Sequence, residues 1–264
     1  MIIYGSRMYG RKNQIRSHGR CEHCGRVGAQ NSYDGRKWGH LYFIPIIPDG
    51  RRVRVLRECK SCQKGFHIPL ETLPGIVESI QKTLIDAVVA IGAKENEMTV
   101  NGHSLSVVSV LGANISDAYC LGGESEVRLL LENLKSIKAD KELLLAEAKA
   151  AEVRGDLKNA EAKFGELATR STHPVILYQA ARFFQDQARI PEAIALGERV
   201  ESMLPADLNV KQLLIDGYTA QKEWTKLALT YENCFLLAPE LKQQKPIAKA
   251  YQKACKKAGR EPQK

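Results

Sequence analysis

Cys21-Glu22-His23-Cys24-Gly25 and Cys59-Lys60-Ser61-Cys62 are the stretches that decide the fold of the first part of this 264-residue chain. Two residues separate the cysteines of each pair, a spacing that lets both thiolates reach one metal ion. Gly25 supplies the positive φ with which the backbone can turn its N–H groups toward the sulfurs. Four thiolates complete a tetrahedral zinc site and leave no position open for a catalytic water. We therefore predict a structural zinc ion bound by Cys21, Cys24, Cys59 and Cys62.

The segment between the two pairs predicts a β-hairpin. It is 34 residues long, whereas the usual gap in such sites is about 15–20 residues. Residues 38–48 are rich in aromatic and β-branched side chains, and residues 51–58 partly alternate valine with arginine. Asp49-Gly50 between them predicts the hairpin turn. Such a hairpin would bring the second cysteine pair beside the first, as in a zinc ribbon.

Residues 1–70 resemble a small family of zinc-ribbon domains. The resemblance rests on the opening Ile2-Ile3-Tyr4-Gly5, on the two cysteine pairs and on a Phe43-Ile44-Pro45 signature before the second pair. It implies a structural zinc site and no catalytic activity. The second pair departs from the family pattern, because its glycine, Gly65, comes late. Four nearby histidines are alternative ligands that we expect to be surface or packing residues: His18, His23, His40 and His67.

The middle of the chain, residues 71–140, predicts a helical connector that is partly irregular. Thr72 and Pro74 are typical of a helix start, and the apolar spacing that follows predicts a helix to about Gly92. Residues 95–123 show no clean period and contain several glycines, which predicts a loop or a loosely packed segment. A second helical pattern begins near Glu124.

Residues 141–264 repeat with a period near 34, the spacing between Pro205 and Pro239. Gly155-Asp156 marks a break between two helices, and Ala160 and Phe164 follow as a small residue and an aromatic one. These positions resemble the tetratricopeptide (TPR) family over residues 141–240. The resemblance implies about three helix pairs and a capping helix over residues 247–257. Gly197 and Leu227 depart from the pattern, since an aromatic and a small residue are expected there.

The TPR resemblance also implies a binding groove built by the first helix of each pair. A protein or peptide partner is expected there, and the mixture of residues is not a Lys/Asn clamp for a terminal carboxylate. The repeat register places these residues in the groove: Lys149, Glu152, Tyr178, Arg182, Gln185, Gln212, Asp216 and Thr219.

Charge is unevenly distributed along the chain. Residues 1–70 hold 14 basic and 4 acidic side chains (+10), residues 71–241 hold 17 and 25 (−8), and residues 242–264 hold 8 and 1 (+7). The basic head is either a solvated surface or a surface that meets something acidic, including this chain's own acidic body. Binding of nucleic acid through the basic ribbon is the alternative function.

Together these patterns predict an α+β fold, mostly α: a small β zinc ribbon (1–70), the connector (71–140) and an α-solenoid of about three TPR-like helix pairs (141–264). No Walker loop, dinucleotide fingerprint or catalytic triad motif occurs, so we expect no enzyme. The short apolar start and the lack of a long apolar run predict a cytoplasmic protein with no membrane insertion. The expected role is a protein-interaction scaffold or adaptor, with a regulatory subunit of an enzyme complex as a further option.

Overall fold

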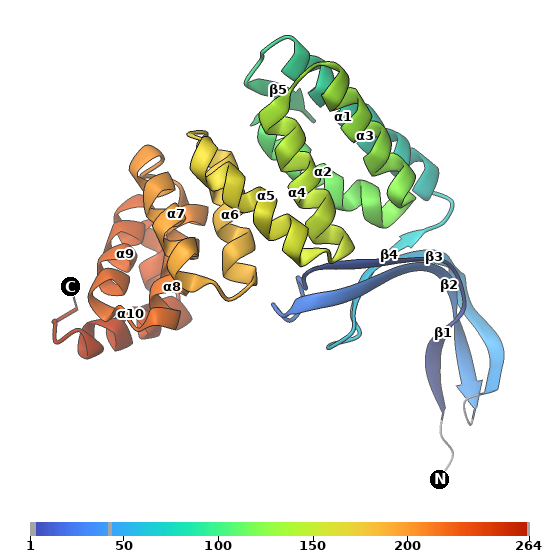
Figure 1. Ribbon diagram of the computed structural model, residues 1–264. Helices are drawn as coiled ribbons and strands as arrows, with labels where there is room; N and C mark the ends of the chain where they lie inside the picture. The colour runs from blue at the N-terminus through green and yellow to red at the C-terminus, as the bar shows by residue number, and fades with distance from the viewer. Residues whose placement is uncertain (1–3, 42–43, 263–264) are drawn as a thin grey trace. The chain divides into compact units, whose positions relative to one another are not determined.

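A computed structural model describes residues 4–41 and 44–262. The chain divides into two compact units, Met1–Lys163 and Phe164–Lys264. The first unit holds a small antiparallel sheet and several helices, and the second is helical (Figure 1). The predicted class, α+β and mostly α, with a sheet followed by helix pairs, is confirmed. Ile2, Ile3 and Phe43, which contribute to the zinc-ribbon resemblance, lie outside the described residues.

The sheet is an antiparallel meander with the strand order β1-β2-β3-β4. Its strands are β1 (Tyr4–Arg20), β2 (Val27–Leu41), β3 (Ile44–Cys59) and β4 (Phe66–Pro69). The first three are long, and one buried cross-strand contact near their middle joins Tyr33 of β2 to Val55 of β3. The Tyr33 hydroxyl donates to Glu58 Oε1 at 2.7 Å.

The predicted turn at Asp49-Gly50 is wrong, because both residues lie inside β3. The β2–β3 register there passes from Arg36↔Arg52 to Trp38↔Pro48, so β3 carries extra residues opposite β2. Gly50 has a φ of 92°. A bulge and a tight turn both use a glycine with positive φ, which is why this dipeptide is compatible with either.

The helical part of the first unit contains α1 (Leu73–Gly92), α2 (Val107–Gly122), α3 (Glu124–Ser136) and α4 (Asp140–Arg154). The helices predicted to end near Gly92 and to begin near Glu124 are confirmed. The loop predicted over residues 95–123 is wrong. It contains a hairpin of β5 (Glu97–Val100) and β6 (His103–Ser106), followed by α2.

Burial explains why α2 has no clean period. Leu111 and Ile115 are fully buried among side chains of α1, α3 and α4, while Val107 and Val110 pack against a second cluster beside α1 and β5. A helix that is buried on several faces lacks the polar stripe that reveals an amphipathic helix. α2 is therefore the central helix of this core.

The remaining helices follow in pairs. They are α5 (Leu157–Arg170), α6 (Pro174–Asp186), α7 (Ile190–Met203), α8 (Leu208–Gln221), α9 (Trp224–Leu237), the short 3₁₀ helix η1 (Pro239–Gln243) and α10 (Lys245–Lys257). Within the second unit, each helix from α6 to α10 packs against the next α-helix in the sequence. Phe164 stacks on Phe183 with ring centroids 4.6 Å apart.

Gly197, which departs from the TPR pattern, stands where α7 and α8 approach closely. A Cβ at this position would lie 2.7 Å from Leu213 Cδ2 and 2.9 Å from Leu214 Cδ2. Two leucines of α8 thus fill the space of the expected aromatic. Leu227 is likewise buried in the core. Neither departure interrupts its helix. None of the helices in the described ranges has the length and hydropathy of a membrane span.

Candidate metal centre and helical groove

The two cysteine pairs lie in turns at the same end of the sheet. Cys21 and Cys24 belong to the turn between β1 and β2, whereas Cys59 is the last residue of β3 and Cys62 belongs to the turn between β3 and β4. Because the sheet is an antiparallel meander, alternate turns fall at the same end. A direct link also exists, since the Lys60 N–H donates to the Ala29 carbonyl at 3.4 Å.

The two turns have the same backbone hydrogen bonds. The N–H groups of Cys21 and Cys59 each donate to the carbonyl five residues later, at 2.9 Å in both turns. The N–H groups of Gly25 and Gln63 each donate back to the first cysteine's carbonyl, at 2.8 Å in both. Gly25 has a φ of 70° and Gln63 a φ of 57°. Gln63 therefore adopts the left-handed conformation that glycine provides in the first turn.

The late glycine has a different role. A Cβ on Gly65 would lie 2.7 Å from the Leu56 carbonyl oxygen and 3.0 Å from backbone atoms of Glu58. Gly65 is thus required where the chain leaves the turn and passes close to the backbone of β3. The departure from the family pattern leaves the geometry of the second turn intact.

The four sulfurs form a compact cluster. Cys21 Sγ and Cys62 Sγ are 3.7 Å apart, Cys24 Sγ and Cys59 Sγ are 3.9 Å apart, and all four lie within 4.8 Å of one another. A tetrahedral zinc with Zn–S bonds of about 2.3 Å has sulfur–sulfur edges of roughly 3.8 Å. A disulfide would need about 2.05 Å, so these are free thiols. The donor set and its spacing fit one tetrahedral metal ion.

The environment of the sulfurs favours thiolate at one position and thiol at another. Backbone N–H groups of Cys62 and Ser61 lower the pKa of Cys59 to about 6. The Arg26 N–H lowers the pKa of Cys24, but desolvation and the neighbouring sulfurs outweigh it and raise that pKa to about 11. Cys59 therefore loses its proton at a lower pH than Cys24 does. A cation bound among the sulfurs would favour the loss of the other protons, which makes metal binding proton-coupled.

No histidine joins the cysteine cluster among the described residues. The His23 ring instead lies against Phe66, with centroids 5.3 Å apart. His40 is buried in β2, His18 is half-buried in β1, and His67 is exposed in β4.

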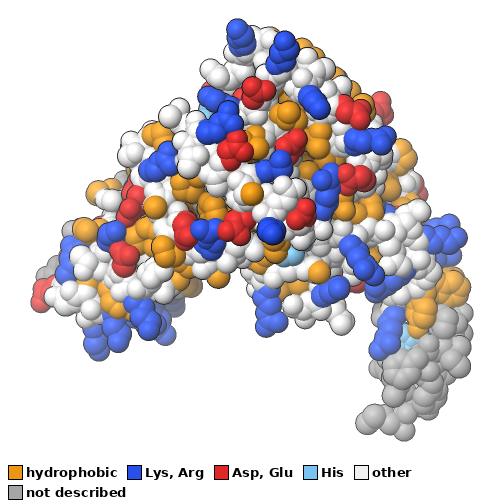
Figure 2. Space-filling model, in the orientation of Figure 1, with side chains coloured by type: hydrophobic (Ala, Val, Ile, Leu, Met, Phe, Trp, Pro, Cys, Tyr) orange, Lys and Arg blue, Asp and Glu red, His pale blue; other side chains and the backbone are white. Residues whose placement is uncertain are grey.

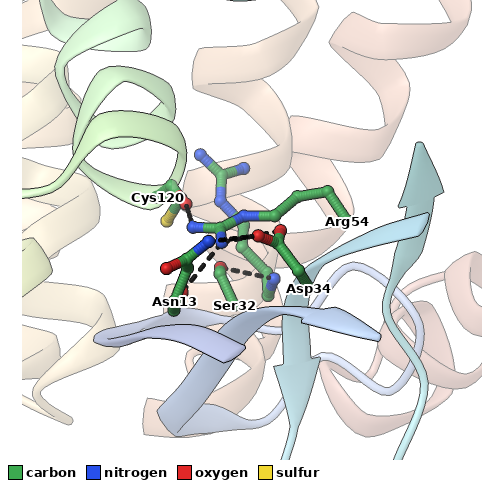
Figure 3. A network of polar contacts seen from close by, with 6 residues as sticks. Asn13, Ser32, Asp34, Arg54 and Cys120 are labelled. Atoms are coloured by element: carbon green, nitrogen blue, oxygen red, sulfur yellow. Dashed lines mark hydrogen bonds and ion pairs between the residues drawn. The ribbon is translucent and has the colours of Figure 1, made fainter. Parts of the chain in front are cut away.

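A buried arginine connects the sheet to the helices of the first unit (Figure 3). Arg54, 2% exposed, donates through Nη1 to Asp34 Oδ1 at 3.0 Å and to the Asn13 carbonyl at 2.8 Å. Its Nη2 donates to the Cys120 carbonyl at 3.0 Å, in the last turn of α2. Asn13 Nδ2 in turn donates to Asp34 Oδ2 at 2.6 Å. Arg54 thus satisfies a helix-end carbonyl from the sheet. Sequence patterns indicated only that this residue alternates with valines.

Two arginines of the basic head form ion pairs with acidic side chains of the same chain. Such contacts agree with the interpretation in which the head meets this chain's own acidic body. Arg57 pairs with Asp117 of α2 at 2.5 Å and Arg51 pairs with Glu71. Burial raises the pKa of Asp117, while Arg57 opposes that shift. Over the helices of the face drawn in Figure 2, acidic and basic side chains are interspersed. The drawn surface therefore carries a closer mixture of positive and negative side chains than the net charges of the three sequence segments suggest.

Five of the predicted groove residues lie on α6 and α8, which contact each other in the second unit. On α6, Tyr178 and Arg182 are half-buried, and on α8, Gln212, Asp216 and Thr219 are exposed. Gln212 Nε2 donates to Asp216 Oδ1 at 2.8 Å. Burial raises the pKa of Tyr178, and its electrostatic neighbours are Arg182, Asp207 and Asp216. These two helices thus share one polar surface with both signs of charge.

The other three predicted groove residues have different surroundings. Gln185 of α6 is 8% exposed, and its amide donates to the Leu213 carbonyl of α8 at 3.3 Å. It therefore ties α6 to α8 beneath the surface. Lys149 and Glu152 lie on α4 in the first unit and form an ion pair with each other at 2.6 Å.

Comparisons with known proteins add a structural likeness to solved chains. No family model and no curated protein matches the chain. A solved chain described as "MamA RS-1 ArsTM double mutant" is similar over 58% of this chain and 91% of its own, with 22% identity and a TM-score of 0.44.

Proposed function

We propose that this protein is a non-enzymatic, cytoplasmic interaction scaffold, in which a structural zinc ion stabilises the head and the helix pairs bind a protein or peptide. The observation that carries the proposal is the shared surface of α6 and α8, where Tyr178, Arg182, Gln212, Asp216 and Thr219 reach solvent. Tyrosine and arginine are enriched at the energetic centres of protein interfaces.

The metal identity follows from the donor set. Four thiolates at tetrahedral spacing are typical of structural zinc, and they fill its coordination shell. Such a centre has no site for a substrate or an activated water. All seven cysteines are free thiols, which supports a reducing compartment such as the cytoplasm.

The mixed charge of the surface on α6 and α8 suggests the chemistry of the partner. The basic Arg182 and the acidic Asp207 and Asp216 are electrostatic neighbours of Tyr178. A segment that carries both an acidic and a basic side chain near an apolar anchor would complement them. The partner is accordingly expected to be a mixed-charge peptide or helix rather than a uniformly acidic one.

Site-specific photo-crosslinking tests this proposal. A photoreactive amino acid at Thr219 should capture one predominant protein partner, whereas the same probe at Asn233, exposed on α9, should not. Arg182→Ala should then weaken binding of the captured partner by several-fold or more, because truncating an interface arginine commonly costs more than about 1 kcal/mol. Lys253→Ala, a matched loss of an exposed cation on α10, should leave binding unchanged. Equal crosslinking at both probe positions would contradict the groove.

The alternative function, a nucleic-acid-associated factor that uses the head, is favoured by one observation. Three basic side chains around a hollow of the sheet have no acidic partner among the described residues. If crosslinking at Thr219 disappears after nuclease treatment, this alternative replaces the scaffold as the primary role.

A further inference from the structure

One face of the sheet in the head contains a cavity of about 540 Å³. It is lined from three strands: Tyr9 and Lys12 come from β1, Arg36 and Trp38 from β2, and Arg52 from β3. Pockets of roughly 300–1,000 Å³ hold small organic ligands. The cavity lies apart from the cysteine cluster, since neither cysteine turn contributes to its wall.

The strand pattern explains how these side chains meet. Asp34, Arg36 and Trp38 alternate along β2, so all three project from one face of the sheet. Arg36 is directly opposite Tyr9 on β1 and Arg52 on β3. Register shifts interrupt both strand pairs beside these residues. Such irregularities bend a sheet and increase its twist, which hollows the face.

The cations around the cavity are not neutralised by ion pairs within the described part of the chain. Lys12, Arg36 and Arg52 make no ion pair among the described residues, and Arg36 uses only its Nε, donating to the Gly50 carbonyl at 2.9 Å. The acidic residue of the wall, Asp34, is already bonded to Arg54 and Asn13. Like charges directly opposite each other on neighbouring strands are destabilising. The Arg36–Arg52 pair is therefore a feature that a bound anion would stabilise.

The aromatic residues indicate what accompanies the anion. Trp38 and Tyr9 border the same cavity as the three cations. A planar heterocycle can stack on such rings while guanidinium groups bind a phosphate. Inorganic phosphate alone would use the cations and would make no stacking contact with Trp38.

We propose that this cavity binds a nucleoside phosphate, with the base against Trp38 and the phosphate held by Arg36, Arg52 and Lys12. The ligand has two sources with the same chemistry: a free mononucleotide or one nucleotide of a single strand. The site does not depend on the α6–α8 surface. It gives the nucleic-acid alternative a defined place and ligand chemistry.

Tryptophan fluorescence tests the proposal, because the chain has two tryptophans and Trp224→Phe leaves Trp38 as the sole reporter. The zinc-loaded protein is titrated with AMP, with a ten-nucleotide single-stranded RNA and with inorganic phosphate. AMP or the RNA should quench Trp38, and phosphate should compete without quenching. Similar affinity for AMP and RNA would assign a mononucleotide site, whereas RNA binding at least tenfold tighter would assign a strand; both support the proposal.

The variants separate this site from general charge attraction. Arg36→Gln with Arg52→Gln should weaken ligand binding at least tenfold and keep or raise the melting temperature of the head, because a like-charge pair is removed. Arg16→Gln with Lys60→Gln removes the same charge from exposed positions of the head outside the cavity and should change binding less than twofold. Trp38→Leu removes the stacking ring and the reporter while keeping all the cations, so its binding is measured by titration calorimetry and should be at least tenfold weaker. Tyr178→Ala should have no effect.

Two results would overturn the proposal. One is the absence of quenching by both AMP and the RNA, even where phosphate binds. The other is an equal loss of affinity in the two double-charge variants.

Discussion

The β-sheet of the head and the helices of the second unit achieve stability in different ways. In the sheet, Tyr33 and Val55 are the large apolar side chains that are fully buried, among those that the structure describes there. The other buried positions are occupied by Cys21 and Cys59 and by polar side chains, of which Arg54 is the largest. In the second unit, α6, α7 and α8 each bury several aliphatic or aromatic side chains, and Phe164 and Phe183 stack within its core.

This contrast indicates that the head needs a metal ion and a polar network in order to be stable, whereas the helices are stabilised by apolar packing alone. Burial of one large apolar side chain contributes about 1.5–3 kcal/mol, so two such residues cannot offset the conformational entropy of long strands. A structural zinc site supplies the missing free energy in small domains. The following predictions test the contrast, beginning with the largest expected effect.

Removal of zinc should unfold the head and leave the second unit folded. Structural zinc contributes about 10–16 kcal/mol of apparent binding free energy at neutral pH, and this energy is coupled to folding. After treatment with a strong zinc chelator, hydrogen exchange should become fast for the amides of β2 and β3 and stay slow for those of α8. The zinc-loaded chelator is the control. Protection of β2 that survives complete zinc loss, verified by elemental analysis, would contradict the metal-dependent head.

Arg54→Met tests the polar network of the head. The substitution leaves Asp34 and the Cys120 carbonyl without their shared donor, and loss of one partner of a buried ion pair costs about 3–5 kcal/mol. Denaturant unfolding in excess zinc, followed by Trp38 fluorescence in the Trp224→Phe background, measures this cost. Arg51→Ala, which removes an exposed pair with Glu71, should change stability by less than about 0.5 kcal/mol. A loss in Arg54→Met no larger than in this control would show that the network is dispensable.

Asp34→Leu combined with Arg54→Met refines the test. Replacement of both charges by apolar groups should recover part of the lost stability, because no unpaired carboxylate remains. The recovery is expected to be incomplete, since the Cys120 and Asn13 carbonyls still lack the arginine N–H groups.

Gly197→Ala tests the role of packing in the helices. Its Cβ would lie within 3.0 Å of two leucine side chains of α8, and overpacking of this kind costs about 1–3 kcal/mol. Gly165→Ala is the matched control, because a Cβ there meets nothing within 4 Å and alanine favours a helix by about 1 kcal/mol. Thermal unfolding followed by Trp224 fluorescence in a Trp38→Phe background should separate the two variants in opposite directions. Equal melting temperatures would argue that α7 and α8 pack loosely.

The comparison also explains which parts of the fold could be predicted from the sequence. The helices of the second unit each keep a stripe of partly or fully exposed residues beside their buried ones, so their apolar spacing and the Gly-Asp break before α5 revealed them. α2 was missed because it is buried on several faces. The β5–β6 hairpin was missed although its turn, Asn101-Gly102, has the positive φ values of 49° and 81° that favour such a turn. The flanking strands are only four residues each.

The candidate sites also divide into one that the sequence predicted and others that it did not. The cysteine spacing predicted the cluster, since metal ligands in a turn are fixed by local chemistry. The cavity beside Trp38 and the Arg54 network depend on the register of three strands, and a bulge changes that register without a unique sequence signal. The repeat register predicted Gln185 in the groove, but its depth beneath the surface depends on the approach of α8, which the sequence pattern does not give.

The smallest effects are expected at the two cysteine turns. These turns have the same backbone hydrogen bonds, but the residue with positive φ is Gly25 in the first turn and Gln63 in the second. Left-handed backbone costs a residue with a side chain about 1–2 kcal/mol, so Gly25→Ala should weaken zinc binding about 5- to 30-fold. Gln63→Gly removes that cost but adds about 0.5–1 kcal/mol of backbone entropy in the unfolded chain. The net gain is at most about 1.5 kcal/mol, so its affinity for zinc should rise by no more than about 13-fold. Competition against a chromogenic chelator measures both changes in zinc affinity.

Gly65→Ala should weaken zinc binding as well, because its Cβ would clash with the Leu56 carbonyl oxygen and not because of its φ. If Gln63→Gly weakens zinc binding instead, the Gln63 side chain must stabilise the turn, and the equivalence of the two turns would be limited to their hydrogen bonds.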